Sequence, residues 1–148
     1  MTIINSSHKK TSLKNIEKFE AEHDIKIPRQ YREFLLEFNG GNVKPNVFKI
    51  SKKEGESVVN TLYGIDINES YDDLANVFDS LNGEIPDCFL SIGDDSGGNQ
   101  ICLGIDGIYY EKIYLWIHDL ESTEEMDNMF FLADSFNGFL DSLYEGEG

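Results

Sequence analysis

The chain has 148 residues, of which 40% are hydrophobic, and a formal charge of -16 at pH 7. This length predicts one domain that buries about two-thirds of its unfolded surface, and ten Phe, seven Tyr and one Trp exclude a disordered chain. Residues 1–53 carry 11 basic and 6 acidic side chains, net +5, whereas residues 54–148 carry 1 and 22, net -21. Because carboxylates repel phosphate groups, the acidic part is not expected to bind nucleic acid or a membrane, and a basic protein is its natural partner.

Four helices are predicted from apolar residues that recur with helical spacing. The first runs from about Ser12 to His23, with Leu13, Ile16 and Phe19 on its inner side. The other three share a spacing of 3, 1 and 3 residues, which is typical of a helix with one buried face. Their apolar stripes are Tyr31-Phe34-Leu35-Phe38, Leu74-Val77-Phe78-Leu81 and Phe136-Phe139-Leu140-Leu143. Residues that favour helix ends flank the stripes: Pro28, Asn39-Gly40-Gly41, Ser70 and Asp134-Ser135.

Short runs rich in β-branched and aromatic residues alternate with these helices. The predicted strands are residues 47–50, 58–67, 89–92, 101–105 and 108–117. Every residue from Ile113 to Ile117 is apolar or aromatic, as expected of a strand covered on both faces. Asp106-Gly107 favours a tight antiparallel hairpin between the last two strands. We therefore expect an α+β fold: a single domain, residues 1–148, in which an antiparallel β-sheet meander is flanked by N-terminal helices and a C-terminal helix, with one helix inserted.

The two cysteines, Cys88 and Cys102, are too few for a disulfide framework or a zinc site. If their segments form a hairpin that turns near Ser96 and Gly97, Cys88 faces about residue 105 and Cys102 about residue 91, so a disulfide is not expected. Because the sequence shows neither an export signal nor an apolar run long enough for a membrane helix, a cytoplasmic location is expected.

One loop invites a catalytic interpretation. Asp94-Asp95-Ser96-Gly97-Gly98 resembles the nucleophile loop of trypsin-like serine proteases, in which the serine needs a histidine base. His23 is on a predicted helix, so a flexible hairpin turn is favoured and a hydrolase that uses Ser96 stays a minor hypothesis. Asp66, Asn68 and Ser70 begin the alternation of a calcium-binding EF-hand loop, but Tyr71 and Val77 stand at its sixth and twelfth positions, so no metal site and no cofactor are predicted.

Acidic clusters in the second part of the chain are the candidate binding residues. A charge run is usually a solvated face, and acids at a helix start complement the helix dipole. Neither explanation accounts for a single lysine among 22 acids, because self-repulsion costs stability. The predicted partner contacts are Asp72, Asp73, Asp94, Asp95, Glu121, Glu124, Glu125 and Asp127.

Three motifs in one order resemble the SUKH superfamily, over about residues 12–144. The first is the helix motif Ile27-Pro28-Arg29-Gln30-Tyr31-Arg32-Glu33-Phe34-Leu35, followed by Phe38-Asn39-Gly40-Gly41. The second is the strand and turn Phe89-Leu90-Ser91-Ile92-Gly93-Asp94-Asp95-Ser96-Gly97-Gly98-Asn99. The third is the closing helix Ala133-Asp134-Ser135-Phe136-Asn137-Gly138-Phe139-Leu140. The resemblance implies an α+β domain with helices around an antiparallel sheet and no catalytic residues.

Bacterial members of this superfamily look like immunity proteins that neutralise toxins, many of them nucleases, and fungal members regulate cell-wall assembly. The resemblance therefore implies a non-enzymatic immunity protein that binds a cognate, basic toxin domain through an acidic surface. A regulatory or scaffolding module of the cell-wall-regulator type is the alternative. Self-association is a further hypothesis, in which the basic first 53 residues of one copy meet the acidic remainder of another.

Overall fold

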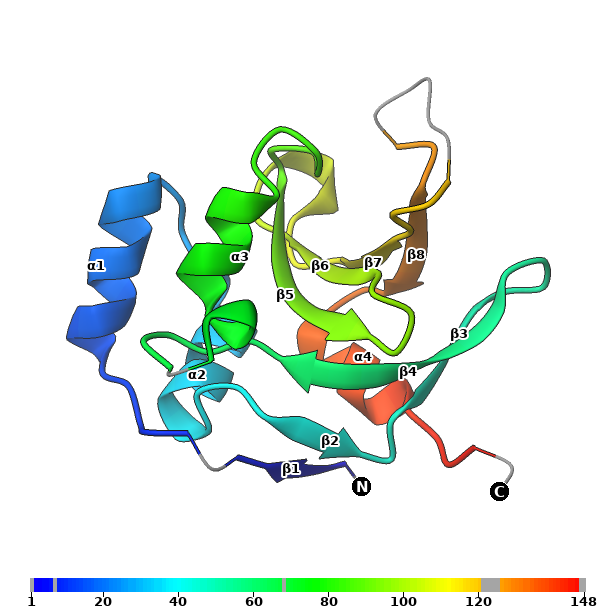
Figure 1. Ribbon diagram of the computed structural model, residues 1–148, viewed down its shortest axis with the longest axis horizontal. Coiled ribbons are helices and arrows are strands. Elements are labelled where there is room, and N and C mark those ends of the chain that lie inside the picture. Colours follow the sequence, from blue (N-terminus) through cyan, green and yellow to red (C-terminus); the bar gives the residue numbers. More distant parts are fainter. Residues whose placement is uncertain (1, 7, 68, 121–125, 147–148) are drawn as a thin grey trace.

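A six-stranded antiparallel sheet forms the centre of the computed structural model, which describes residues 2–6, 8–67, 69–120 and 126–146 (Figure 1). Its strands follow one another in chain order, which confirms the predicted meander. They are β3 (Val47–Ser51), β4 (Gly55–Leu62), β5 (Phe89–Asp95), β6 (Gln100–Gly104), β7 (Ile113–Trp116) and β8 (Met129–Ala133). A separate two-stranded sheet pairs β1 (Ile3–Asn5) with β2 (Asn42–Lys44).

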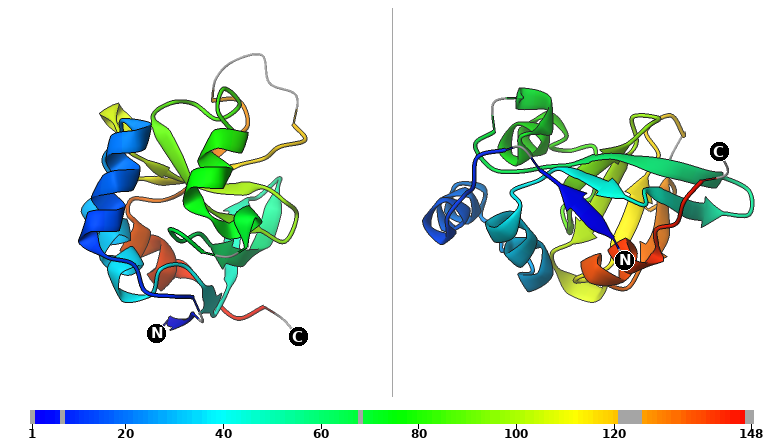
Figure 2. Two further views of the ribbon diagram at one scale, coloured as in Figure 1. Left: turned by 60° about the vertical axis from the view of Figure 1, so that its left-hand side comes forward. Right: turned by 90° about the horizontal axis from the view of Figure 1, so that it is seen from below.

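The helices confirm the four predicted stripes. They are α1 (Leu13–His23), α2 (Arg29–Glu37), α3 (Leu74–Ser80) and α4 (Phe136–Ser142), with short 3-10 helices η1 (Ser70–Asp72) and η2 (Gly107–Tyr109). Ser12 and Ser135 cap α1 and α4 by accepting the backbone N–H of Asn15 and Gly138, respectively. In Figures 1 and 2, α2 lies next to α4, while α3 lies between α1 and β5. The fold is therefore the expected α+β arrangement with one helix inserted.

Both faces of the sheet are covered, but by different groups. On the face toward α2 and α4, Ile101 and Leu115 pack into the main core, where the Tyr31 and Phe136 rings meet edge to face at 4.9 Å. On the opposite face Trp116 joins a smaller cluster, whose other buried members are Ile85, Phe89, Cys102 and Met129. The alternation of Leu115 and Trp116 between these clusters confirms that β7 is covered on both sides.

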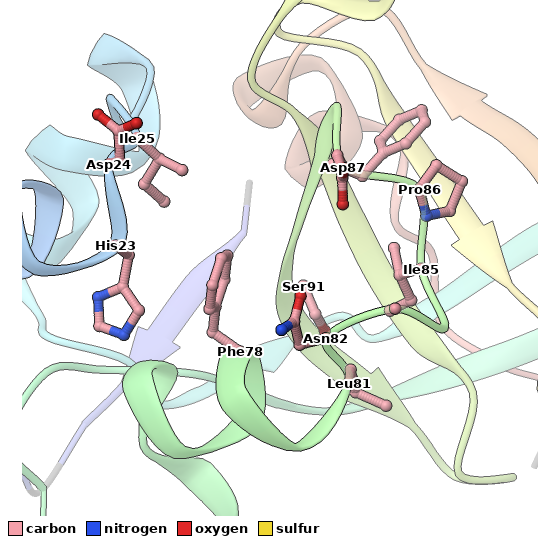
Figure 3. A pocket seen from close by; sticks show the side chains of 12 residues that line it. His23, Asp24, Ile25, Phe78, Leu81, Asn82, Ile85, Pro86, Asp87 and Ser91 are labelled. Carbon is pink, nitrogen blue, oxygen red and sulfur yellow. The ribbon is translucent and has the colours of Figure 1, made fainter.

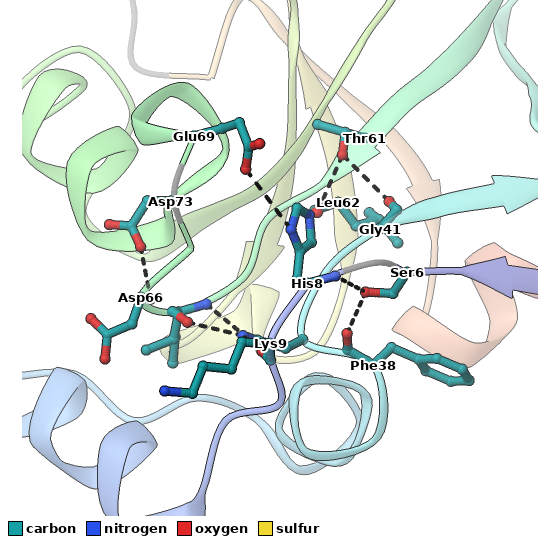
Figure 4. Close-up of polar contacts among 12 residues, drawn as sticks. Ser6, His8, Lys9, Phe38, Gly41, Thr61, Leu62, Asp66, Glu69 and Asp73 are labelled. Atoms are coloured by element: carbon teal, nitrogen blue, oxygen red, sulfur yellow. Dashed lines mark hydrogen bonds and ion pairs between the residues drawn. The ribbon is translucent and has the colours of Figure 1, made fainter.

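Asn39 joins three segments that are far apart in the sequence. Its Nδ2 donates to the carbonyls of Lys9 and Ile65, at 2.8 and 2.9 Å, and its Oδ1 accepts the Ile65 N–H at 2.8 Å. Figure 4 shows Lys9 and its neighbours lying between the end of α2 and the exit of β4, where Ser6 Oγ also donates to the Phe38 carbonyl. A Cβ atom on Gly64 would stand 2.3 Å from the Asn39 carbonyl oxygen, so the two backbones touch. The Asn39-Gly40-Gly41 motif therefore stabilises the fold by holding these segments together.

The cysteine register is as predicted. Ser91 stands opposite Cys102, and the Ile105 N–H donates to the Cys88 carbonyl at 2.8 Å. No disulfide joins Cys88 and Cys102, as expected from that offset. Burial raises the pKa of the Cys102 thiol, which lies wholly inside the smaller cluster.

Some local predictions were wrong. The β6–β7 connection is not a two-residue turn at Asp106-Gly107, because it contains η2, whose start Asp106 caps through its Oδ1. Helix α3 is capped by Asp73 rather than preceded directly by Ser70, which begins η1. Strands β1, β2 and β8 were not predicted. The first two have three residues each, too few to display an alternating pattern.

Candidate protein-binding surface

Asp72 and Asp94 are two predicted partner contacts, and in the structure they lie close enough for their negative charges to repel each other. Burial raises the pKa of both carboxyls, and the charge of Asp72 raises the pKa of Asp94 further. Asn60 Nδ2 donates to Asp94 Oδ1 at 3.1 Å. The Tyr63 hydroxyl donates to Gln100 Oε1 at 2.8 Å, and its own pKa is raised, first by burial and then by the charge of Asp94. Negative charge is therefore concentrated here at a cost in stability.

Asp94→Asn is expected to raise the free energy of unfolding at pH 7 by about 0.5 kcal/mol, a value discounted because the carboxylate is half-exposed. The folded-state pKa is raised above its ordinary value of 3.8, so the folded chain disfavours the ionised form. The penalty is present above the folded-state pKa and disappears as the pH falls below 3.8. Urea titrations between pH 3.5 and 7 would check this. A gain that did not shrink at low pH, or one matched by the exposed control Asp119→Asn, would contradict it.

Asp73 and Asp95 are buried and bonded within the chain. Asp73 accepts the backbone N–H groups of Asp66 and Asn76, at 2.9 and 3.3 Å, and so fixes the start of α3. Asp95, 3% exposed, accepts four hydrogen bonds. Their donors are the N–H groups of Gly97 and Asn99, the Asn99 amide and the Ser57 hydroxyl, at 2.8 to 3.0 Å. Both carboxylates hold turns in place and are not part of the surface proposed below.

The remaining predicted contacts lie in the connection between β7 and β8. Asp127 is exposed. Glu121, Glu124 and Glu125 lie outside the described residues. Their contact with a partner stays a prediction.

A groove that the sequence did not indicate lies between the end of α1 and the segment that leads from α3 into β5. This α1–β5 groove has a volume of about 320 Å³. Figure 3 shows His23 and Ile25 on one side, Ile85 and Asp87 on the other, and Phe78 between them. The other lining residues are Asp24, Leu81, Asn82, Gly83, Pro86, Phe89 and Ser91.

Aromatic packing fixes one wall of the groove. The His23 ring lies against the Phe19 and Phe78 rings, with centroids 4.4 and 4.9 Å away. Its Nδ1 is 2.8 Å from the Phe19 carbonyl oxygen, and its Nε2 is 3.5 Å from Asp79 Oδ1. Ring packing and the Nδ1 contact therefore hold His23 in place, and it acts as part of the wall.

Carboxylates surround the groove. Asp24 and Asp87 are exposed and line both this groove and an adjoining hollow of about 400 Å³. The hollow is also lined by Glu17, Glu20 and Asp106, and Lys26 is the only lysine or arginine among the described residues of either lining. Sequence reasoning missed this concentration because Glu17, Glu20 and Asp24 belong to the first 53 residues, whose net charge is positive, and adjoin Asp87 and Asp106 only in the fold.

Ser96 lies in the turn between β5 and β6. His118 is close to this turn, but its Nε2 lies 3.2 Å from the Gly97 carbonyl oxygen, and its N–H donates to Asn99 Oδ1. In the described ranges no hydrogen bond joins His118 to Ser96, so the geometry does not support the hydrolase hypothesis.

Neither a metal cluster nor a membrane span is found in the part of the chain that the structure describes. No group of three or more His, Cys, Asp or Glu side chains there could hold a metal ion. None of the described helices is both long and apolar enough to cross a bilayer. The strongest chemical feature is instead a hollowed, acidic surface with an apolar floor.

Two curated proteins of Bacillus subtilis (strain 168) are similar to this chain. The SPbeta prophage-derived uncharacterized protein YokK is 24% identical over 136 residues, which cover 80% of this chain and 67% of the relative. The uncharacterized protein YobM is 29% identical over 125 residues, which cover 76% of this chain and 64% of the relative. The chain thus spans about two thirds of the length of these relatives.

The match to a protein family covers most of the chain. Residues 10–142 match the SMI1 / KNR4 family (SUKH-1), in agreement with the three motifs described above. That range includes all four helices and the whole six-stranded sheet. This chain therefore belongs to the SMI1 / KNR4 (SUKH-1) family.

Proposed function

We propose that this chain is a non-enzymatic, cytoplasmic immunity protein that binds and neutralises a cognate bacterial toxin domain through its acidic surface. The observation that carries the proposal is the charge of residues 54–148, net -21 with Lys112 as the only lysine or arginine. Lys112 Nζ is itself paired, 3.2 Å from Asp134 Oδ1. Lysine or arginine partners for the other acids of this part must therefore come from the first 53 residues or from another protein.

A basic toxin fits this field. A nuclease must present lysine and arginine side chains to its phosphate substrate, and an acidic inhibitor is drawn toward that surface and can cover it. Membership of the family and the prophage origin of one relative support the same role. Binding alone achieves neutralisation, so the proposal requires no catalytic group.

The test is co-expression with the toxin domain encoded beside this gene. We expect the protein to restore growth and to be recovered in a complex with intact toxin. The complex is expected to weaken as salt is raised, because exposed charges are screened beyond about 8 Å at physiological ionic strength. If the protein neither binds the toxin nor protects the cell, the proposal is wrong. If the toxin is recovered in cleaved form, the protein acts on it as an enzyme and not by binding alone.

A further inference from the structure

We propose that the α1–β5 groove receives an arginine side chain of the basic partner. The inference deepens the proposed function and rests on it in taking the partner to be a basic protein. The proposal gives the contact between the two proteins a defined site, which is separate from the acidic residues predicted from the sequence to bind the partner.

The floor of the groove suits the stem of a long side chain. Phe78 and Leu81 present apolar surface in the groove, and Ile25 and Ile85 extend it on the two facing walls. Arginine buries its aliphatic stem on such surface and keeps its charged head at the edge. Phe78 is half-buried, so its ring remains accessible for stacking by a guanidinium group.

The rim supplies the complementary charge. The exposed carboxylates of Asp24 and Asp87 line the groove, and Glu17 and Asp106 line the adjoining hollow. Carboxylates accept the planar guanidinium fork through paired hydrogen bonds, a geometry that a lysine ammonium cannot match. An anionic or neutral side chain bound in the groove would leave the negative charge of these carboxylates unbalanced.

The groove is also held in shape before a partner arrives. The His23 ring is packed against Phe19 and Phe78, with its Nδ1 2.8 Å from the Phe19 carbonyl oxygen, and Ile85, on the opposite wall, is buried in the smaller cluster. Little side-chain ordering is therefore needed on binding.

The probe is N-acetyl-arginine methylamide, followed by NMR chemical shifts, with the citrulline analogue as its neutral counterpart. We expect shifts that cluster at His23, Ile25 and Ile85 and saturate with a dissociation constant on the order of 1 to 10 mM, as for a ligand with few contacts. The citrulline analogue is expected to produce none. Equal shifts from both compounds, or shifts scattered over all acidic residues, would overturn the proposal.

The matched variant is Asp24→Asn combined with Asp87→Asn. Asn suits the left-handed backbone of residue 24, where φ is 54°, so the variant is expected to fold. We expect about tenfold weaker arginine binding, from about threefold for each exposed carboxylate. Asp119→Asn combined with Asp134→Asn removes the same charge elsewhere and is expected to change the affinity less than twofold. Equal losses in the two variants would show a general field effect and refute the site.

The cognate toxin distinguishes the two proposals. If the toxin binds the groove variant and the control variant equally well, the groove assignment fails and the immunity function stands. If the toxin is not bound at all, the immunity function fails, and the arginine titration decides the groove independently.

Discussion

Replacing Asn39 by alanine is expected to lower the free energy of unfolding by about 4 kcal/mol. The change removes three hydrogen bonds at a side chain that is 1% exposed. It leaves the Ile65 N–H and the carbonyls of Lys9 and Ile65 without their Asn39 partner, and each such loss costs about 1 kcal/mol or more. The Asn39 backbone also has φ of 53°, a conformation that costs alanine about 1 kcal/mol.

Two further variants separate these contributions. Asn39→Gly loses the same hydrogen bonds but adopts a positive φ freely, so it is expected to be about 1 kcal/mol more stable than Asn39→Ala. Asn42→Ala removes one exposed amide bond to the Asn60 carbonyl and is expected to cost under about 1 kcal/mol. Urea unfolding midpoints, compared at the same dependence of the unfolding free energy on urea concentration, give the stability change of all three variants. Equal midpoints for Asn39→Ala and Asn42→Ala would contradict the central role of Asn39.

Asp95→Ala is expected to cost about 3 kcal/mol, because four hydrogen bonds converge on its carboxylate. Asp95→Asn keeps an oxygen for the N–H groups of Gly97 and Asn99, so its cost is expected to be about 1 kcal/mol. Asp94→Asn, one residue earlier, is expected to stabilise the fold. The two acids have opposite expected signs because donors satisfy the Asp95 carboxylate, whereas the Asp94 carboxylate is partly buried and also lies near the charge of Asp72.

Thermal unfolding of Asp95→Ala and Asp95→Asn measures this prediction. At a temperature where Asp95→Asn is fully folded, its affinity for the cognate toxin is expected to equal that of the wild type, since the carboxylate is buried. An affinity loss above threefold in that variant would instead make Asp95 a partner contact, as its place in an acidic cluster first indicated. Retention of full stability by Asp95→Ala would exclude the structural role.

Local patterns were sufficient for the helices and for the order of the five strands that were predicted. A single buried stripe determines each helix, and the turn at Ser96 and Gly97 determines the register of β5 against β6, which explains why the Cys88 and Cys102 neighbours were predicted correctly. Strand β8 was missed because its short apolar run, residues 129–133, lies directly between an acidic stretch and the last helix, and periodicity alone does not separate such a run from a helical segment.

The motifs that identify the family concern the fold and leave the site undetermined. Asn39 belongs to the first motif and Asp95 to the second, and the side chains of both make hydrogen bonds within the chain. The groove depends on Asp24 and Asp87, which belong to separate elements and adjoin only when α1 packs against α3. No local pattern carries that information, so the candidate surface had to come from the structure.

Several contacts link residues that are between 97 and 138 positions apart in the sequence. Tyr144 pairs through its backbone with Val47, Thr2 Oγ1 donates to the Leu140 carbonyl at 2.6 Å, and the Asn137 N–H donates to Gln30 Oε1. Such topology folds slowly, on the order of milliseconds to seconds, because distant segments must meet first. Synthesis of 148 residues at about 5 to 20 residues per second adds on the order of ten seconds before these contacts can form. Under the proposed function, this chain is therefore expected to be made before it meets the toxin.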